Sequence, residues 1–147
     1  MRIRNYRPSD LDAVIAIFRS NIPKYFGPEE EPGLREFLAA MRSDEYYVIE
    51  IDDEIVGAGG IALNDDDTVS LCWGMVREDR LGTGLGRKLT EFRIAASREK
   101  FGDRAMVTST SQHTEGFYEM FGFRTVEHTP DGFGPGIDTC KMRLYIS

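Results

Sequence analysis

The stretch Arg80-Leu81-Gly82-Thr83-Gly84-Leu85-Gly86-Arg87-Lys88-Leu89 contains three alternating glycines and leads directly into a helical pattern. Glycines at the mouth of a helix let the backbone approach a ligand closely, and the first-turn N–H groups have no partner inside the helix. Those donors and the helix dipole favour an anion such as a pyrophosphate. The stretch therefore predicts a loop and a helix around an anion site, with the apolar residues of the helix at Leu85, Leu89, Phe92 and Ala96.

Two well-known nucleotide-binding loops do not fit this stretch. A P-loop needs Ser or Thr directly after its lysine, and here Lys88 is followed by Leu89. A dinucleotide-binding loop needs a third glycine three residues after the second, and that position is Arg87. A tight turn without a ligand is a further alternative, although each glycine costs backbone entropy.

The size and charge of the chain restrict its class. Its 147 residues suit one domain, with 41% hydrophobic and 29% charged residues as in an ordinary globular protein. The net charge of −7 argues against nucleic-acid binding and is compatible with a cationic substrate. An anionic cofactor would be held by local cations, with Arg80, Arg87 and Lys88 as candidates.

The location of the protein is predicted to be the cytoplasm. No apolar run approaches the roughly 20 residues that span a membrane, so we expect no membrane partner. The N-terminus, Met1-Arg2-Ile3-Arg4, turns polar at once and does not read as a signal peptide. Cys72 and Cys140 are expected to be reduced thiols.

The remaining patterns predict one mixed sheet with helices on its faces. Strands are expected over residues 2–6, 46–51, 55–63, 69–76, 105–109, 125–127 and 138–146. Helices are expected after an N-cap at Ser9 paired with Asp12, from about Pro32, from the glycine loop to Phe101, and over 114–121. The fold class is thus α/β, in the order β-α-α-β-β-β-α-β-α-β-β.

Two motifs in this order resemble those of the GNAT N-acetyltransferase superfamily. The stretch from Val76 to Leu89 is similar to the acetyl-coenzyme A loop of that family, and Gly116-Phe117-Tyr118-Glu119-Met120-Phe121-Gly122-Phe123 is similar to its late helix. The resemblance implies a single GNAT-like domain over residues 1–147. It also implies an enzyme that moves an acetyl group from acetyl-CoA, as cosubstrate, to a primary amine of a small molecule or peptide by direct attack, without a metal.

The resemblance also implies which residues bind the cofactor. The strand backbone at Met75 and Val76 would hold the pantetheine arm and polarise the carbonyl. The loop amides would take the pyrophosphate. Leu81 stands where the family usually has Arg or Gln, and Ser111 where it often has Asn. The complete cofactor-binding set is Met75, Val76, Leu81, Gly82, Thr83, Gly84, Leu85, Gly86, Arg87 and Ser111.

Tyr118 takes the general-acid role of the family. A phenol, with an ordinary pKa of about 10, is protonated at neutral pH and can give its proton to the departing sulfur. The alternative is a tyrosine that packs at a helix–sheet contact. Two candidates for the proton acceptor stay open: His113, which lies five residues before Tyr118, and a water relay. Glu115 and Glu119 are expected to be solvated helix charges.

The resemblance implies that the acceptor site is shaped by the region around the first two helices, here residues 21–32, and by the late β-hairpin loop, here residues 129–136. Candidate wall residues are Tyr25, Phe26, Phe133, Trp73 and Tyr47, and the run Glu29-Glu30-Glu31 would attract a cation or form a solvated face. The rival function is an acyl-CoA-binding sensor or complex subunit with this fold and little catalysis. A third alternative transfers a longer acyl group or acylates a hydroxyl. A homodimer is a family-level expectation.

Overall fold

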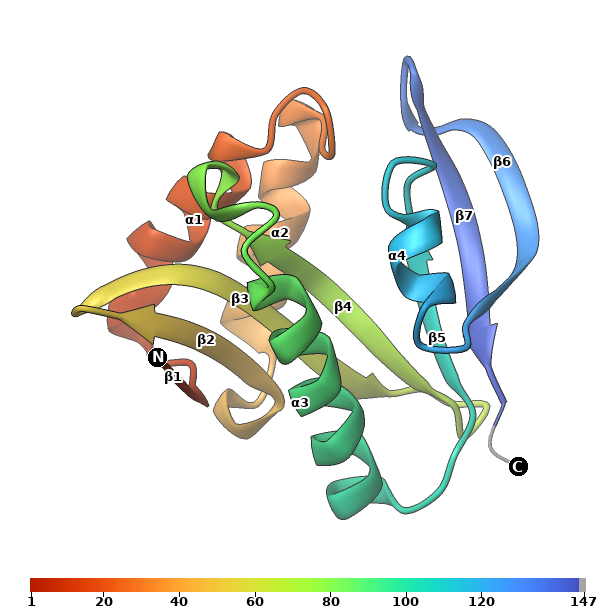
Figure 1. Cartoon of the computed structure of the whole chain (residues 1–147), viewed down its shortest axis with the longest axis horizontal. Coiled ribbons are helices and arrows are strands. Elements are labelled where there is room, and N and C mark those ends of the chain that lie inside the picture. The colour runs from red at the N-terminus through yellow and green to blue at the C-terminus, as the bar shows by residue number, and fades with distance from the viewer. Residues whose placement is uncertain (146–147) are drawn as a thin grey trace.

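The computed structural model of the chain describes residues 1–145 and contains one seven-stranded mixed sheet (Figure 1). The strand order across the sheet is β1-β2-β3-β4-β5-β7-β6. The strands are β1 (Arg2–Asn5), β2 (Tyr46–Ile51), β3 (Glu54–Leu63), β4 (Val69–Val76), β5 (Met106–Thr110), β6 (Arg124–Gly134) and β7 (Ile137–Leu144). The helices are α1 (Leu11–Ser20), α2 (Glu31–Ala40), α3 (Leu85–Phe101) and α4 (Glu115–Glu119).

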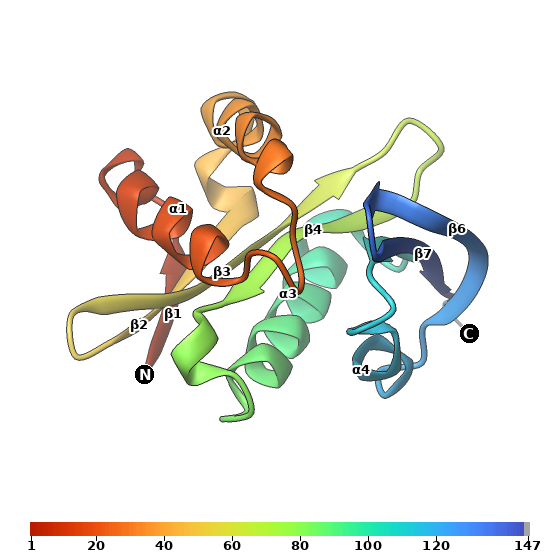
Figure 2. The same ribbon diagram turned by 90° about the horizontal axis from the view of Figure 1, so that it is seen from above.

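The helices form a layer on each face of this sheet. Figure 2 shows α1 and α2 on one face and α3 and α4 on the other. All neighbouring strands are antiparallel except β4 and β5, which run parallel because α3 connects them as a crossover. The order of elements and the mixed sheet expected from the sequence are confirmed.

The sheet splits between β4 and β5. These strands pair only from Val69 to Leu71 on β4 and from Met106 to Thr108 on β5, and then diverge (Figure 1). The register of β3 on β4 shifts at the same level, where Trp73 has a φ of +46°. A bulge of this kind bends a strand and increases its twist. The bulge therefore helps to turn β4 away from β5 and to open the sheet.

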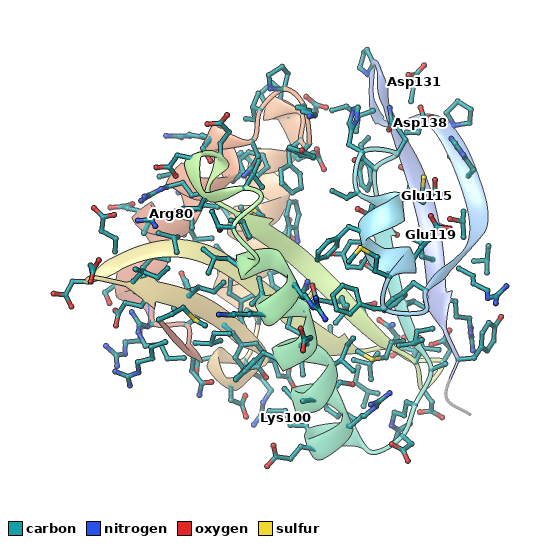
Figure 3. The ribbon with its side chains drawn as sticks, viewed as in Figure 1. Arg80, Lys100, Glu115, Glu119, Asp131 and Asp138 are labelled. Atoms are coloured by element: carbon teal, nitrogen blue, oxygen red, sulfur yellow. The ribbon has the colours of Figure 1, made fainter. Side chains whose placement is uncertain are left out.

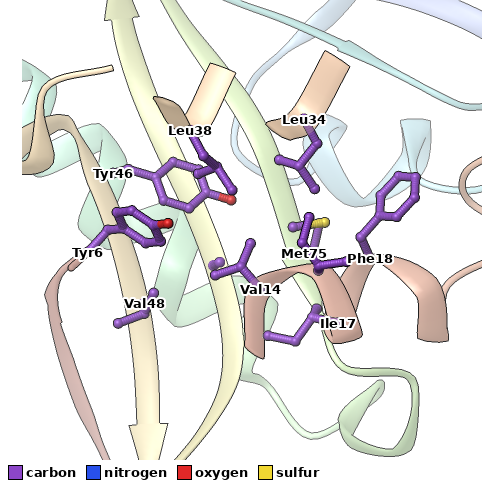
Figure 4. Close-up of a cluster of buried hydrophobic side chains, with 11 residues drawn as sticks. Tyr6, Val14, Ile17, Phe18, Leu34, Leu38, Tyr46, Val48 and Met75 are labelled. Atoms are coloured by element: carbon purple, nitrogen blue, oxygen red, sulfur yellow. The ribbon is translucent and has the colours of Figure 1, made fainter. Parts of the chain in front are cut away.

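The strand β2 has core residues on both of its faces. Tyr46 and Val48 pack against α1 and α2 in the cluster shown in Figure 4, together with Phe18 and Leu34. The alternate residues of β2 contribute to the clusters under α3. Burying both faces explains why this strand reads as an unbroken apolar run.

Several boundaries differ from the sequence-based expectation. The expected Ser9 cap is wrong: a 3-10 turn over Pro8–Asp10 precedes α1, and the Asp10 carboxylate accepts the N–H of Arg7 at 2.9 Å. Phe92 is 37% exposed, because α3 turns its polar residues Thr90, Arg93 and Ser97 inward beside its leucines.

The β6 strand extends far beyond residues 125–127. It reaches Gly134 and so includes most of the segment that we expected to be a loop. Its residues up to Gly132 are exposed, so no alternation of buried and exposed residues marks the strand in the sequence. Pairing with β7 holds the strand instead. The last strand ends at Leu144, and Ile146 lies outside the described residues.

The ion pair of Arg4 and Asp10 gives the first stability prediction. The two side chains form hydrogen bonds of 2.9 and 3.0 Å, and Asp10 is 7% exposed. Burial opposes the charge of Asp10, but the bonds from Arg4 and from the Arg7 N–H hold its pKa below the usual value. We expect Asp10→Asn to lower the free energy of unfolding by about 2 kcal/mol at pH 7.

Urea unfolding at several pH values measures this difference. A lowered pKa stabilises the fold above the ordinary carboxyl range, near about pH 4, and the gain is lost as pH falls through the folded-state pKa. The difference in free energy of unfolding between the wild type and Asp10→Asn should therefore become smaller at acid pH. Asp12→Asn, two residues further along and exposed, is the control. Equal stability of all three proteins at pH 7 would contradict the prediction.

Candidate active site

One cavity of about 430 Å³ crosses the sheet at the split between β4 and β5. It connects the glycine loop on the α3 side with the α1–α2 connection on the opposite face. Its walls come from β4, β5, α3, α4 and the loops beside them. Of the predicted site residues, those that line this cavity are Met75, Val76, Leu81, Gly86, Ser111 and Tyr118.

The glycine loop has a backbone conformation that requires its glycines. Gly82 and Gly84 have φ values of +79° and +85°, which side chains other than glycine rarely adopt. Gly84 is the N-cap of α3, and no side chain caps this helix end or places a carboxylate in its first turn. The first-turn amides of α3 are therefore available to an anion.

The other predicted loop residues lie outside the cavity wall. Thr83 is exposed and its hydroxyl donates to the carbonyl of Arg80, whereas Leu85 is buried in the core. Leu81 is 42% exposed and presents an apolar side chain at the cavity. The loop thus offers backbone groups rather than polar side chains.

Positive charge lies close to the loop. Arg80 belongs to the 3-10 turn just before it and is labelled in Figure 3. Arg87 is engaged by Glu91 at 3.1 Å, one turn further along α3. Within residues 1–145, Arg80 and Lys88 form no salt bridge. These two cations can therefore face an anion without first losing a partner.

The strand backbone beside the loop is partly engaged. The side-chain amide of Asn21 donates to the carbonyl of Val76 at 2.9 Å, and Asn21 is itself buried. This contact ties the end of α1 to the end of β4. Ser111 is buried on the opposite wall, where its hydroxyl accepts the N–H of His113 at 3.2 Å.

Tyr118 lies in the wall of the cavity and is 8% exposed. Its ring packs edge-on against Phe117 and Phe123, with centroids 5.2 and 5.8 Å apart. Its hydroxyl lies 3.5 Å from Nη2 of Arg93. The ring of Tyr118 is therefore fixed by packing, as expected of a tyrosine at a helix–sheet contact. Its hydroxyl lies at the cavity, as the general-acid role requires.

The remaining charged or titratable candidates on and before α4 lie away from the cavity. His113 is exposed, with its ring edge-on to Tyr25 at a centroid distance of 6.0 Å. Glu115 and Glu119 lie on the side of α4 away from α3 (Figure 3). Glu115 accepts a hydrogen bond from the hydroxyl of Thr125 on β6. None of these three residues lines the described cavity.

The far end of the cavity is aromatic and acidic. Tyr25, Phe26, Trp73 and Phe133 line it, and the rings of Phe26 and Trp73 stack at 6.1 Å. Tyr47 is not part of this wall. Its ring packs on Phe92 beside α3 and its hydroxyl donates to the carbonyl of Asp44.

The acidic run Glu29-Glu30-Glu31 divides between two roles. Glu31 pairs with Arg19 at 2.7 Å and with Arg35 at 3.1 Å and so holds α1 to α2. Glu30 lines the cavity and accepts the N–H of Gly27 at 2.8 Å. Burial raises the pKa of Glu30, and the charge of Glu29 raises it further. The hydrogen bond from Gly27 lowers this pKa but does not cancel the rise.

Sequence reasoning missed Arg93 and Asn21 in the cavity wall. A signal existed for Arg93, since it follows Leu89 by four residues and therefore shares its helix face. Nothing local marked Asn21, because its partner is 55 residues away. Within residues 1–145 no group of side chains is arranged to hold a metal, and no helix is long and apolar enough to cross a membrane.

The split mixed sheet, the cavity that crosses it and the glycine loop at the start of α3 define the class of acetyltransferase domains. The sequence model of the acetyltransferase (GNAT) domain matches residues 25–146, so the chain belongs to this family. A search among curated proteins finds no match.

Solved structures share the fold over almost the whole chain. A GNAT-family acetyltransferase from Desulfovibrio desulfuricans is 24% identical, with 99% of both chains covered and a TM-score of 0.80. A ribosomal-protein-alanine N-acetyltransferase from Brucella melitensis is 18% identical, with 99% and 100% covered and a TM-score of 0.80. The acetyltransferase yncA from Salmonella typhimurium, solved with acetyl-CoA, is 21% identical, with 100% and 94% covered and a TM-score of 0.78. At these identities the similarity shows the fold.

Proposed function

We propose that this protein transfers the acetyl group of acetyl-CoA to the primary amine of a small molecule or peptide, with Tyr118 as the general acid. One observation carries the proposal. A single cavity joins an uncapped glycine loop, the hydroxyl of Tyr118 and an acidic, aromatic end on the other face of the sheet. Two substrates that enter from opposite faces would meet at this split.

The residues around the loop fit coenzyme A. The first-turn amides of α3 have no capping side chain, and Arg80, in the turn before the loop, and Lys88, in the first turn of α3, can supply positive charge. The backbone of Met75 and Val76 would bind the pantetheine arm where β4 has left β5, and Ser111 faces the same space. When bound, the cofactor supplies the thioester that the amine attacks.

The reaction needs a group that stabilises negative charge and a group that donates a proton. Backbone N–H groups at the β4 bulge would stabilise the negative charge that develops on the carbonyl oxygen. The Tyr118 hydroxyl gives its proton to the leaving sulfur. The packing of its ring between Phe117 and Phe123 holds the hydroxyl in place for this transfer.

Glu30 and the aromatic rings around it select the amine. A carboxylate attracts an ammonium group, and the faces of Trp73 and Tyr25 favour a cation over a neutral molecule. We expect Glu30→Gln to raise the KM for a primary amine about tenfold, the value of one charge-assisted hydrogen bond, and to leave acetyl-CoA binding unchanged. Glu36→Gln on the exposed face of α2 is the matched control.

A thiol-release assay with acetyl-CoA and a panel of primary amines tests the function itself. Amine-dependent release of free thiol supports acetyl transfer, and the same assay on the Glu30 variant measures the change in KM. Binding of acetyl-CoA without amine-dependent release would refute the transfer reaction and support a sensor. A KM that Glu30→Gln and Glu36→Gln change equally would remove Glu30 from the acceptor site.

A further inference from the structure

Arg93 is the largest of the fully buried side chains, at 1% exposure. It lies on the inward face of α3 and lines the cavity beside Tyr118. Lysine and arginine are almost never fully buried unless a partner of opposite charge accompanies them. The surroundings of this guanidinium therefore need an explanation.

The contacts of Arg93 are few and long. Nη1 donates to the carbonyl of Gly60 at 3.4 Å and Nη2 donates to the hydroxyl of Tyr118 at 3.5 Å. Nε is buried and has no hydrogen-bond partner within the described chain. Across residues 1–145, no carboxylate lies within salt-bridge distance of the guanidinium. The guanidinium of Arg93 has the geometry to bind a carboxylate, but no carboxylate of the described residues is in reach.

The ionisable neighbours of Arg93 do not supply the missing charge. Burial raises the pKa of Cys72 to about 11, even though the guanidinium opposes the shift. Burial likewise raises the pKa of Tyr46 above its usual value. Both groups are neutral at physiological pH, so the positive charge of Arg93 is not balanced by them.

Two glycines make room for the guanidinium at the cavity wall, and a third supplies a carbonyl that accepts from it. A Cβ added at Gly59 would lie 3.1 Å from Cζ of Arg93, and one added at Gly74 would lie 2.6 Å from Nη2. Gly60, whose carbonyl accepts from Nη1, pairs with Cys72, close to where β4 leaves β5. The backbone is therefore shaped to keep the guanidinium at the split rather than to fill the space with apolar side chains.

The charged residues of the cavity suit a substrate that carries both a positive and a negative group. Among the residues that line it in the described chain, Glu30 and Arg93 are the two that carry charge. Glu30 lies in the connection before α2, on one face of the sheet, and Arg93 is on α3, on the other. A ligand that spans the split would meet a negative group at one end and a positive group at the other.

We propose that Arg93 binds a carboxylate carried by one of the two substrates, which rests on the acetyl-transfer function proposed above. The planar guanidinium can donate two parallel hydrogen bonds to a carboxylate, and in a buried site this pairing is strong and selective. The carboxylate comes either from an acceptor of the amino-acid type, with Glu30 facing its ammonium group, or from the far end of a dicarboxylic acyl group on coenzyme A. The chemistry at Arg93 is the same in both cases.

Titration calorimetry separates the two sources. The acceptor arm compares α-amino acids with their α-amides in the presence of saturating coenzyme A. The donor arm compares succinyl-CoA with butyryl-CoA, which has the same four-carbon length without the charge. We expect one arm to show a preference of at least about tenfold for the carboxylate and the other to show none. Arg93→Gln should abolish that preference and leave the affinity for free coenzyme A unchanged.

The controls keep this test independent of the proposed function. Arg98→Gln removes an exposed arginine from the same helix and should preserve the preference. Arg93→Lys replaces Arg93→Gln if that variant does not fold. Lysine keeps the positive charge but cannot donate two parallel hydrogen bonds, so the preference for the carboxylate should weaken. No preference in either arm of the wild type, or one that survives both Arg93 variants, would overturn the proposal. If the wild type does not bind coenzyme A, or shows no amine-dependent thiol release, the acetyltransferase function is refuted instead.

Discussion

Gly84→Glu is expected to lose coenzyme A binding by at least about 100-fold while the protein stays folded. Gly84 is the N-cap of α3, and its φ of +85° suits glycine. No atom lies within 4 Å of an added Cβ, so the glutamate fits, at the cost of roughly 1–2 kcal/mol of backbone strain. Its carboxylate would occupy the place where the free amides and the helix dipole favour the pyrophosphate. Calorimetry with coenzyme A, together with circular dichroism, measures both expectations.

The other end of the same helix provides a matched control. Gly102 is the C-cap of α3, with a φ of +79° and again no atom within 4 Å of an added Cβ. Gly102→Glu therefore introduces the same charge away from the loop, and its ψ of −170° strains a side chain more than the ψ of 0° at Gly84 does. It should lose stability but keep coenzyme A affinity. If a folded Gly84→Glu variant bound coenzyme A as well as Gly102→Glu does, the loop would not be the pyrophosphate site.

Tyr118→Phe is expected to lower kcat about 100-fold and to change coenzyme A affinity little. The ring contacts with Phe117 and Phe123 do not involve the hydroxyl, so the packing of α4 survives the change. The variant loses the proton donor for the leaving sulfur, an interaction that matters in the transition state. Steady-state rates at saturating amine and acetyl-CoA, beside calorimetry with coenzyme A, separate the two effects.

Tyr47→Phe is the control for this prediction. Its hydroxyl also makes a hydrogen bond, to the carbonyl of Asp44 at 2.9 Å, but Tyr47 is not part of the wall of the cavity at the β4–β5 split. Both variants remove one phenolic oxygen from a mostly buried ring. An unchanged kcat in Tyr118→Phe at saturation of both substrates would remove Tyr118 from the general-acid role.

The elements of the fold that carry a local pattern could be predicted from the sequence. The buried strand over residues 46–51 and the helix after the glycine loop both appear in the structure, because apolar spacing reports which residues face a core. The β6 strand could not be predicted in its full length. Its residues are exposed and its pairing partner, β7, supplies the order that its own side chains do not.

The candidate site divides in the same way. The loop could be predicted, because its alternating glycines mark it in the sequence, and Gly82 and Gly84 have the positive φ values that glycine adopts freely. Glu30 and Glu31 are adjacent in the sequence and chemically identical, yet one lines the cavity and the other pairs with Arg19 and Arg35. No local pattern separates them.

By itself the sequence determined the order of the elements, the glycine loop at the start of a helix and a tyrosine on the late helix. These features depend on backbone conformation and on neighbours within a few residues. Only the tertiary structure decided that β4 leaves β5 after Leu71, and that Arg93 faces the resulting cavity without a carboxylate partner. The physical reason is that strand register and the pairing of buried charges depend on residues far apart in the chain, which meet only when the sheet forms.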